Sequence, residues 1–142
     1  LEVFTDLPRA ARNLLGEMKL DLVGLKPFAS LFPSEISGGM KKRAAIARAM
    51  ALEPSILFLD EPSAGLDPVT SAELDRLILR LRDTHSITFV IVTHELASIF
   101  AVADRCIMLD KQTQRLIASG APAELRAHAE RPAVRAFFNR EG

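Results

Sequence analysis

Four consecutive large apolar residues, Ile56–Leu59, stand between Pro54 and Pro62. A run this short without polar alternation predicts a β-strand buried on both faces, as in a parallel sheet covered by helices. Ile87–Thr93 is a second run of this kind and is rich in β-branched residues. Between the two runs, the apolar residues of Pro68–Arg82 recur on one face of a helix. The order of these elements predicts an α/β fold with a mostly parallel sheet.

The other elements are predicted from helical periodicity and from turn-forming residues. Helices are expected over Asp6–Leu25 (continuous, or broken near Leu20), Gly39–Leu52, Glu95–Ala103, Pro122–His128 and Pro132–Asn139. Lys26–Glu35 contains two prolines and predicts a loop, whereas Arg105–Leu109 with Arg115–Ser119 predicts a β-hairpin. Because the last helix carries Val134 and two phenylalanines, we expect it to cover its own domain, with docking on a neighbouring subunit as the alternative.

The composition is typical of a folded domain without a strong net charge. Of the 142 residues, 49% are hydrophobic and 25% are charged, which excludes a largely disordered chain. The 18 Lys and Arg residues balance 18 Asp and Glu residues, so a strongly basic nucleic-acid surface is not expected. Cys106 is the only cysteine, which excludes an intrachain disulfide and favours a reducing compartment. No apolar run approaches the roughly 18 residues that span a bilayer.

The first candidate binding motif is Ser37-Gly38-Gly39, followed by the alanine- and arginine-rich stretch 41–49. A serine cap and two glycines leave backbone N–H groups uncovered at the start of a helix. The helix dipole adds partial positive charge there, so the motif is suited to a phosphate group. The alternative for Ser-Gly-Gly alone is an ordinary capped helix.

The second motif is Asp60-Glu61-Pro62, directly after the first buried strand. In open α/β sheets, ligands bind beyond the carboxyl ends of the strands. An aspartate at this position can hold Mg²⁺, which prefers one or two carboxylates together with phosphate oxygens. The adjacent glutamate could act on an attacking water as a general base. The alternative is an acidic turn after a core strand.

The third motif is His94, which follows the strand Ile87–Thr93. A histidine there could donate a hydrogen bond to a phosphate oxygen and help to position a water molecule. A helix-capping or packing role is the alternative for this residue alone.

Together and in this order, the motifs resemble those of the ATPase subunit of ABC transporters. Ser37–Gly39 match the family signature, Asp60-Glu61 the end of the Walker B strand, Ser63–Asp67 the D-loop and His94 the H-loop. Asp60 lies 21 residues beyond Gly39, and the resemblance extends over the chain from Leu20 onward. Thr5–Pro8, Met18–Leu25 and a methionine, Met40, in place of the usual glutamine are similar to the Mla/Mce-type lipid-transport ATPases.

The resemblance implies the C-terminal part of a P-loop NTPase fold, in which parallel strands with flanking helices adjoin part of a helical subdomain. Residues 1–54 are then expected to belong to the helical subdomain, 55–120 to the catalytic core and 121–142 to C-terminal helices. The family's phosphate-binding loop, G-x-x-x-x-G-K-[ST], and its Q-loop glutamine have no match in this sequence. Because the chain also begins at Leu1 without a methionine, we expect a piece of a longer ATPase that is inactive alone. An exposed apolar edge along Phe89–Thr93 is expected to favour self-association.

The resemblance also implies how an intact ATPase would work. Two such domains stack head to tail, and each ATP with its Mg²⁺ lies between one subunit's Walker B and H-loop and its partner's signature. The implied roles are Mg²⁺ binding for Asp60, action on water for Glu61, a γ-phosphate contact for His94, ATP contacts for Ser37, Gly38 and Gly39, and a position across the interface for Asp67. The pair would drive a membrane permease in lipid transport from the cytoplasmic face of the inner membrane, without nucleic acid.

Two other functions stay open. A chromosome-maintenance or DNA-repair ABC ATPase would carry the same motifs, although the zero net charge and the lack of coiled-coil heptads disfavour it. A non-catalytic partner module would lack the phosphate-binding loop naturally, and its gene would encode none upstream.

Overall fold

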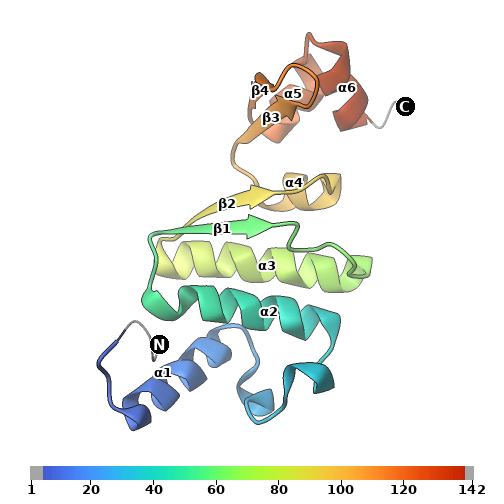
Figure 1. The fold of residues 1–142 in the computed structure, drawn as a ribbon. Helices are drawn as coiled ribbons and strands as arrows, with labels where there is room; N and C mark the ends of the chain where they lie inside the picture. The colour runs from blue at the N-terminus through green and yellow to red at the C-terminus, as the bar shows by residue number, and fades with distance from the viewer. Residues whose placement is uncertain (1–4, 140–142) are drawn as a thin grey trace. The chain divides into compact units, whose positions relative to one another are not determined.

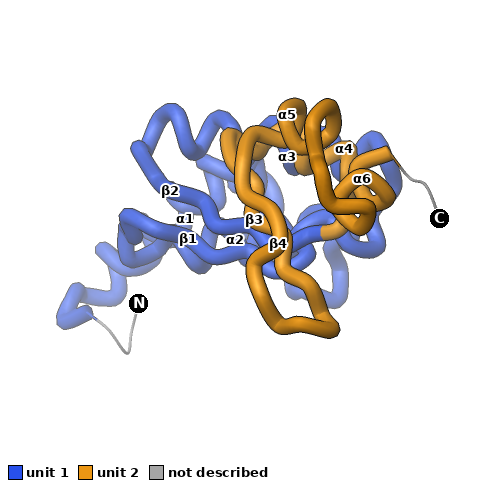
Figure 2. The backbone as a smooth tube through the Cα atoms, turned by 90° about the horizontal axis from the view of Figure 1, so that it is seen from above, with its two compact units in different colours: residues 1–93 blue, residues 94–142 orange. Residues whose placement is uncertain are grey.

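The computed structural model describes residues 5–139 of the chain. The chain divides between Thr93 and His94 into two compact units, unit 1 and unit 2, which are coloured separately in Figure 2. Each unit has its own hydrophobic core. We describe the two units one after the other.

Unit 1 combines three α-helices with a two-stranded parallel sheet (Figure 1). Its elements are α1 (Arg9–Leu22), the 3-10 turns η1 (Lys26–Phe28) and η2 (Pro33–Glu35), α2 (Gly38–Ala49), η3 (Met50–Leu52), β1 (Ile56–Asp60), α3 (Pro68–His85) and β2 (Thr88–Val92). The strands pair in parallel, from Ile56 opposite Thr88 to Asp60 opposite Val92. The connection between them is the helix α3, which lies along the sheet, with α2 on the far side of α3 (Figure 1). The predicted α/β fold with a parallel sheet is confirmed.

The helix boundaries of unit 1 follow from local chemistry. Helix α1 is continuous through Leu20, so the first of the two predicted alternatives is confirmed, although the helix runs over Arg9–Leu22 and not over Asp6–Leu25. Helix α2 ends at Ala49 and tightens into the short turn η3, because Pro54 prevents further helix. Helix α3 extends three residues beyond the predicted Arg82 and ends where Ser86 adopts a left-handed conformation with φ of 53°.

The core of unit 1 lies between α3, the sheet and α2. Its buried residues come from α2, η3, β1 and α3 and from the segments that follow α1 and precede β2: Val23, Leu25, Ile46, Ala47, Met50, Leu57, Leu74, Leu77, Ile78, Leu81 and Ile87. Leu20 and Leu22 of α1 pack against this cluster while remaining partly exposed. The predicted apolar face of α3 is confirmed, because Leu74, Leu77, Ile78 and Leu81 are buried in this core.

The prediction that both strands are buried on both faces is wrong. Along β1 and β2 burial alternates: Leu57 is 4% exposed, whereas Phe58 is 75% exposed. Val90, which lies opposite Phe58 in the sheet, is 40% exposed, and Val92 is 61% exposed. The helices of unit 1 cover one face of the sheet, so the side chains that alternate to the other face stay uncovered. We call Ile56, Phe58, Val90 and Val92 the open face of the sheet.

Unit 2 contains α4 (Leu96–Val102), β3 (Cys106–Asp110), β4 (Arg115–Gly120), α5 (Pro122–His128) and α6 (Pro132–Asn139). Strands β3 and β4 form the predicted antiparallel hairpin, and its register has an irregularity between Met108 and Leu109. Val134 and Phe138 of α6 are almost fully buried together with Ile99, so the last helix covers its own unit. No helix in residues 5–139 is both long and apolar enough to cross a membrane.

Candidate functional site

The centre of the candidate site is the turn after β1, where Glu61 adopts a left-handed backbone conformation with φ of 43°. Its N–H donates to the carbonyl oxygen of Val92 at 2.9 Å, one step beyond the paired residues of the two strands. Its carbonyl oxygen accepts from the N–H of Ala64 at 3.2 Å, and its carboxylate oxygen Oε2 accepts from the Thr93 hydroxyl at 3.3 Å. The Glu61 carboxylate is therefore held at the carboxyl end of both strands, where ligands of α/β sheets bind.

Asp60 is the last residue of β1 and has an exposed side chain. Among the described residues, no hydrogen bond or ion pair engages its carboxylate. No group of three acidic, histidine or cysteine side chains in residues 5–139 is arranged to hold a metal ion. A single open carboxylate nevertheless fits Mg²⁺, because this ion usually takes one or two carboxylates and completes its shell with water and phosphate oxygens.

The Ser-Gly-Gly motif forms the start of α2, as predicted. Ser37 is the N-cap in an extended conformation, and its hydroxyl oxygen accepts from the N–H of Met40 at 3.2 Å. The Ser37 hydroxyl proton stays available for a further acceptor, because a hydroxyl both donates and accepts. The N–H groups of Gly38 and Gly39 precede the first helical hydrogen bonds, and in the described structure neither donates one. This helix start can therefore accept an anion.

Gly39 is also required by packing. A Cβ atom at this position would lie 2.6 Å from Cγ2 of Thr70, on α3, whereas a Cβ at Gly38 would meet its nearest neighbour, Leu66, at an ordinary 3.7 Å. The start of α2 and the start of α3 thus approach so closely that only glycine fits between them without movement. The packing requirement and the phosphate contact implied by the family resemblance are separate reasons for the same residue.

Asp67 is the N-cap of α3. Its Oδ1 accepts from the N–H groups of Val69 and Thr70 at 3.0 and 3.1 Å, and its Oδ2 accepts from the Thr70 hydroxyl at 2.5 Å. The Thr70 hydroxyl, followed by the backbone N–H groups, holds the pKa of the Asp67 carboxyl below its ordinary value of 3.8. This capping role is a sufficient reason for an aspartate at position 67 within a single chain. The position of Asp67 across a subunit interface stays a prediction.

Two further features of this region were not predicted from the sequence. The Nζ of Lys42, one turn into α2, donates to the carbonyl oxygen of Glu61 at 3.0 Å. The hydroxyl oxygen of Ser63 is buried and, within the part of the chain that is described, has no hydrogen-bond partner. Gly39 and Ile46 are buried and lie three residues before and four residues after Lys42, on the same face of α2. This spacing is the sequence signal that could have indicated that the Lys42 side chain points inward.

His94 is exposed and follows Thr93 directly in the chain. It is the first residue of unit 2, so its predicted phosphate contact stays a prediction. Within unit 1, the structure brings Lys42, Glu61 and Thr93 together at the acidic turn, next to Asp60 in sequence. It separately brings Gly39 against Thr70, which also contacts Asp67.

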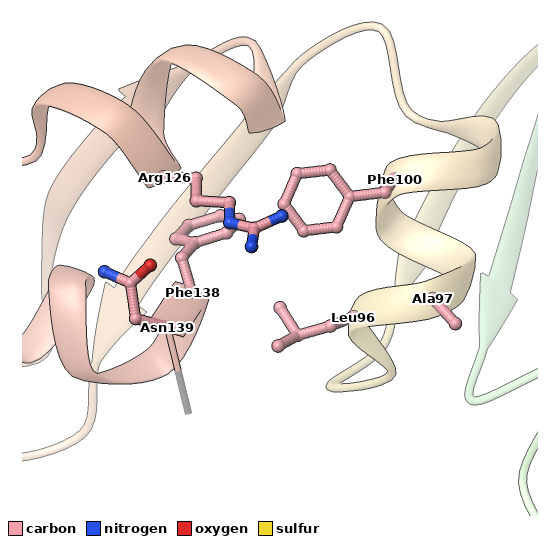
Figure 3. A pocket seen from close by; sticks show the side chains of 6 residues that line it. All are labelled: Leu96, Ala97, Phe100, Arg126, Phe138 and Asn139. Carbon is pink, nitrogen blue, oxygen red and sulfur yellow. The ribbon is translucent and has the colours of Figure 1, made fainter. Parts of the chain in front are cut away.

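A shallow pocket of about 270 Å³ lies in unit 2 (Figure 3). It is lined by Leu96, Ala97, Phe100, Arg126, Phe138 and Asn139. The Arg126 guanidinium carbon lies 5.6 Å from the centre of the Phe100 ring, and the rings of Phe100 and Phe138 meet edge to face at 6.0 Å. None of the residues predicted to bind ATP or Mg²⁺ lines this pocket.

Comparison with known proteins shows which proteins this chain is similar to. Residues 9–64 match the family model described as ABC transporter. A solved ABC transporter of the metal-chelate type, in an inward-facing conformation, matches 78% of this chain and 44% of its own, with a TM-score of 0.72 and 28% identity. The fold is therefore part of a P-loop NTPase fold of the ABC type, as predicted.

Two curated relatives give the comparison more detail. The intermembrane phospholipid transport system ATP-binding protein MlaF of Escherichia coli K12 is 41% identical over 140 residues, or 98% of this chain and 51% of MlaF. The nitrate import ATP-binding protein NrtC of Synechococcus elongatus is 42% identical over 107 residues, or 75% of this chain and 16% of NrtC. The predicted resemblance to the ATP-binding subunits of ABC transporters, and to the Mla type among them, is confirmed. The chain spans about half the length of MlaF.

Proposed function

We propose that this chain is part of the ATP-hydrolysing subunit of an ABC transporter. The observation that carries the proposal is the acidic turn after β1, where Thr93 and the backbone of Val92 hold Glu61 at the carboxyl end of two parallel strands. Asp60 lies beside it in sequence with an open carboxylate. The similarity to MlaF over 98% of the chain supports the same function.

The residues of the turn have distinct roles in this function. Asp60 is suited to hold Mg²⁺, which when bound neutralises charge on the phosphate oxygens. The Glu61 carboxylate accepts a proton from, or orients, the attacking water, as a general base within hydrogen-bond distance can do. The Thr93 hydroxyl, which donates to Oε2 of Glu61, restricts the carboxylate to one orientation. His94 would donate to the γ-phosphate.

The start of α2 would serve a second nucleotide. Ser37, Gly38 and Gly39 present a hydroxyl and two uncommitted N–H groups at a helix N-terminus, an arrangement that suits the phosphates of ATP. In a head-to-tail dimer this ATP belongs to the partner subunit, and Asp67 lies at the interface. The three-part division of the chain into residues 1–54, 55–120 and 121–142 belongs to the same proposal.

The transported substrate is proposed to be a lipid. This rests on the similarity to MlaF, whose name describes intermembrane phospholipid transport, together with Met40 and the segments Thr5–Pro8 and Met18–Leu25. NrtC, with a similar identity, is named for nitrate import, so the motifs alone do not define the cargo. The subunit would act with a membrane permease at the cytoplasmic face of the inner membrane.

The proposal is tested by Mg-ATP binding and turnover of the 142-residue chain beside a chain extended upstream in its reading frame. We expect binding and turnover in the extended chain only, with G-x-x-x-x-G-K-[ST] in the added segment. Glu61→Gln in the extended chain should retain ATP binding and lose nearly all turnover. A reading frame that encodes no such loop would favour a non-catalytic partner module, and wild-type turnover of Glu61→Gln would exclude Glu61 as the base.

A further inference from the structure

We propose that Lys42 is a positioning residue that holds the turn bearing Glu61 and connects it to the helix that begins with Ser37-Gly38-Gly39. The proposal rests on the proposed ATPase function for its consequence, but its structural part stands on unit 1 alone. Lys42 lies on α2 and Glu61 lies after β1, 19 residues later in the chain. The contact between them is the hydrogen bond from Lys42 Nζ to the Glu61 carbonyl oxygen at 3.0 Å.

The backbone of Glu61 needs such support. A residue with a Cβ atom is disfavoured at positive φ, and a conformation of this kind persists only where surrounding contacts determine it. At Glu61 the N–H is fixed by Val92, the carbonyl oxygen by Ala64 and Lys42, and the carboxylate by Thr93. Lys42 is the charged member of this set, and hydrogen bonds from a charged donor are stronger than neutral ones.

The contact also links two functional elements of one subunit. Lys42 is five residues beyond Ser37 on the same helix and three beyond Gly39. A shift of α2 when its N-terminus binds an anion would therefore move the Nζ atom that holds the Glu61 carbonyl. Because catalysis is sensitive to displacements of about 1 Å, this link would make the orientation of the Glu61 carboxylate depend on the position of α2.

The neighbouring residue provides a matched control. Lys41 has the same chemistry on the same turn of α2, but its side chain is exposed and no hydrogen bond or ion pair engages it in the described structure. Lys42→Met removes the donor at nearly constant length, Lys42→Arg retains a cationic donor, and Lys41→Met removes an equivalent charge elsewhere on the helix.

The test combines kinetics with a structural measurement. In the upstream-extended chain, Lys42→Met is expected to lower kcat for ATP about 10- to 100-fold while KM changes less than about twofold. Lys42→Arg should keep kcat within about threefold of the value for the unsubstituted chain. The control Lys41→Met should have the same kcat as the unsubstituted chain. In the 142-residue chain, amide hydrogen exchange at Glu61 and Ala64 should be about tenfold faster in Lys42→Met than in Lys41→Met.

The two parts of the test separate the proposals. Unchanged kcat in Lys42→Met, with turnover lost in Glu61→Gln, would overturn the role of Lys42 and leave the ATPase function standing. If the unsubstituted extended chain does not hydrolyse ATP, the proposed function fails, and the exchange rates alone decide whether Lys42 holds the turn. Equal exchange in Lys42→Met and Lys41→Met would overturn that role as well. If Lys42→Met does not fold, Lys42→Arg decides. A folded Lys42→Arg chain whose kcat is about tenfold below that of the unsubstituted chain would overturn the proposed role of Lys42.

Discussion

Gly39 and Thr70 are in such close contact that the α2 and α3 helix starts would have to separate before any side chain larger than hydrogen could occupy position 39. A Cβ atom on Gly39 would lie 2.6 Å from the Thr70 methyl carbon. The same threonine donates through its hydroxyl to Asp67, the N-cap of α3. One side chain therefore touches the predicted signature with its methyl group and the predicted D-loop with its hydroxyl.

The first prediction follows from this contact. Gly39→Ala should destabilise unit 1 by about 1–3 kcal/mol, as overpacking of a close contact does. Thr70→Ser removes the methyl group and retains the hydroxyl, so adding it to Gly39→Ala should restore most of the loss. Gly38→Ala is the control, because its Cβ would make only an ordinary contact. Equal urea midpoints for Gly39→Ala and Gly38→Ala would contradict the prediction.

The second prediction concerns the pH dependence of stability. The folded pKa of Asp67 is below its ordinary value, so the folded state binds fewer protons than the unfolded state. The resulting stability is fully present above the ordinary value of 3.8 and is lost as the pH falls through the lower folded pKa. Asp67→Asn keeps a capping side chain but does not titrate, so it should flatten this part of the pH profile in urea unfolding.

Asp110 supplies a parallel case in unit 2. Its pKa is lowered chiefly by the hydroxyl of Thr113, so Asp110→Asn should flatten the same acid region independently of Asp67→Asn. An unchanged profile in both variants would show that neither carboxylate carries the acid dependence.

The third prediction concerns the buried hydroxyl of Ser63. Because its oxygen has no hydrogen-bond partner in the described structure, Ser63→Ala should leave stability unchanged or raise it by up to about 2 kcal/mol. Ser30→Ala, at an exposed serine, is the matched control and should have little effect. A loss of more than about 1 kcal/mol in thermal unfolding would mean that the hydroxyl has a partner.

The fourth prediction concerns the open face of the sheet. We expect the 142-residue chain to self-associate through this apolar surface and through the outer edge of β2, which in the described residues pairs with β1 alone. Phe58→Lys should reduce association in sedimentation velocity without unfolding the chain, since Phe58 is 75% exposed. Leu57→Ala, on the covered face, should instead cost about 2–5 kcal/mol of stability. A stable monomer at high concentration would contradict the prediction.

Much of the fold was predictable because apolar spacing and turn residues act locally. The limits of α5 and α6, the hairpin of β3 and β4, and the position of β1 all agree with such signals. The burial of β1 was not predictable, because an apolar run such as Ile56–Leu59 shows that its side chains can be buried on both faces and does not show what covers them. Leu57 and Phe58 are neighbouring large apolar residues in the same run, yet Leu57 is buried and Phe58 is exposed.

The candidate site was predictable only where the residue type carries the chemistry. Asp60, Glu61 and Ser37 follow from such reasoning, because their side chains are found where the secondary structure predicts. Lys42 was missed because its partner is a backbone carbonyl 19 residues away, and no side-chain pattern marks a carbonyl. The left-handed backbone of Glu61 was missed for a related reason, since glycine or asparagine is the usual signal for positive φ.

The left-handed backbone at position 61 also has a consequence for stability. Glycine adopts positive φ without the cost of about 1–3 kcal/mol that other residues incur. Glu61→Gly should accordingly melt at a higher temperature than the natural chain. A carboxylate at position 61 therefore comes with a backbone conformation that lowers the stability of the folded chain.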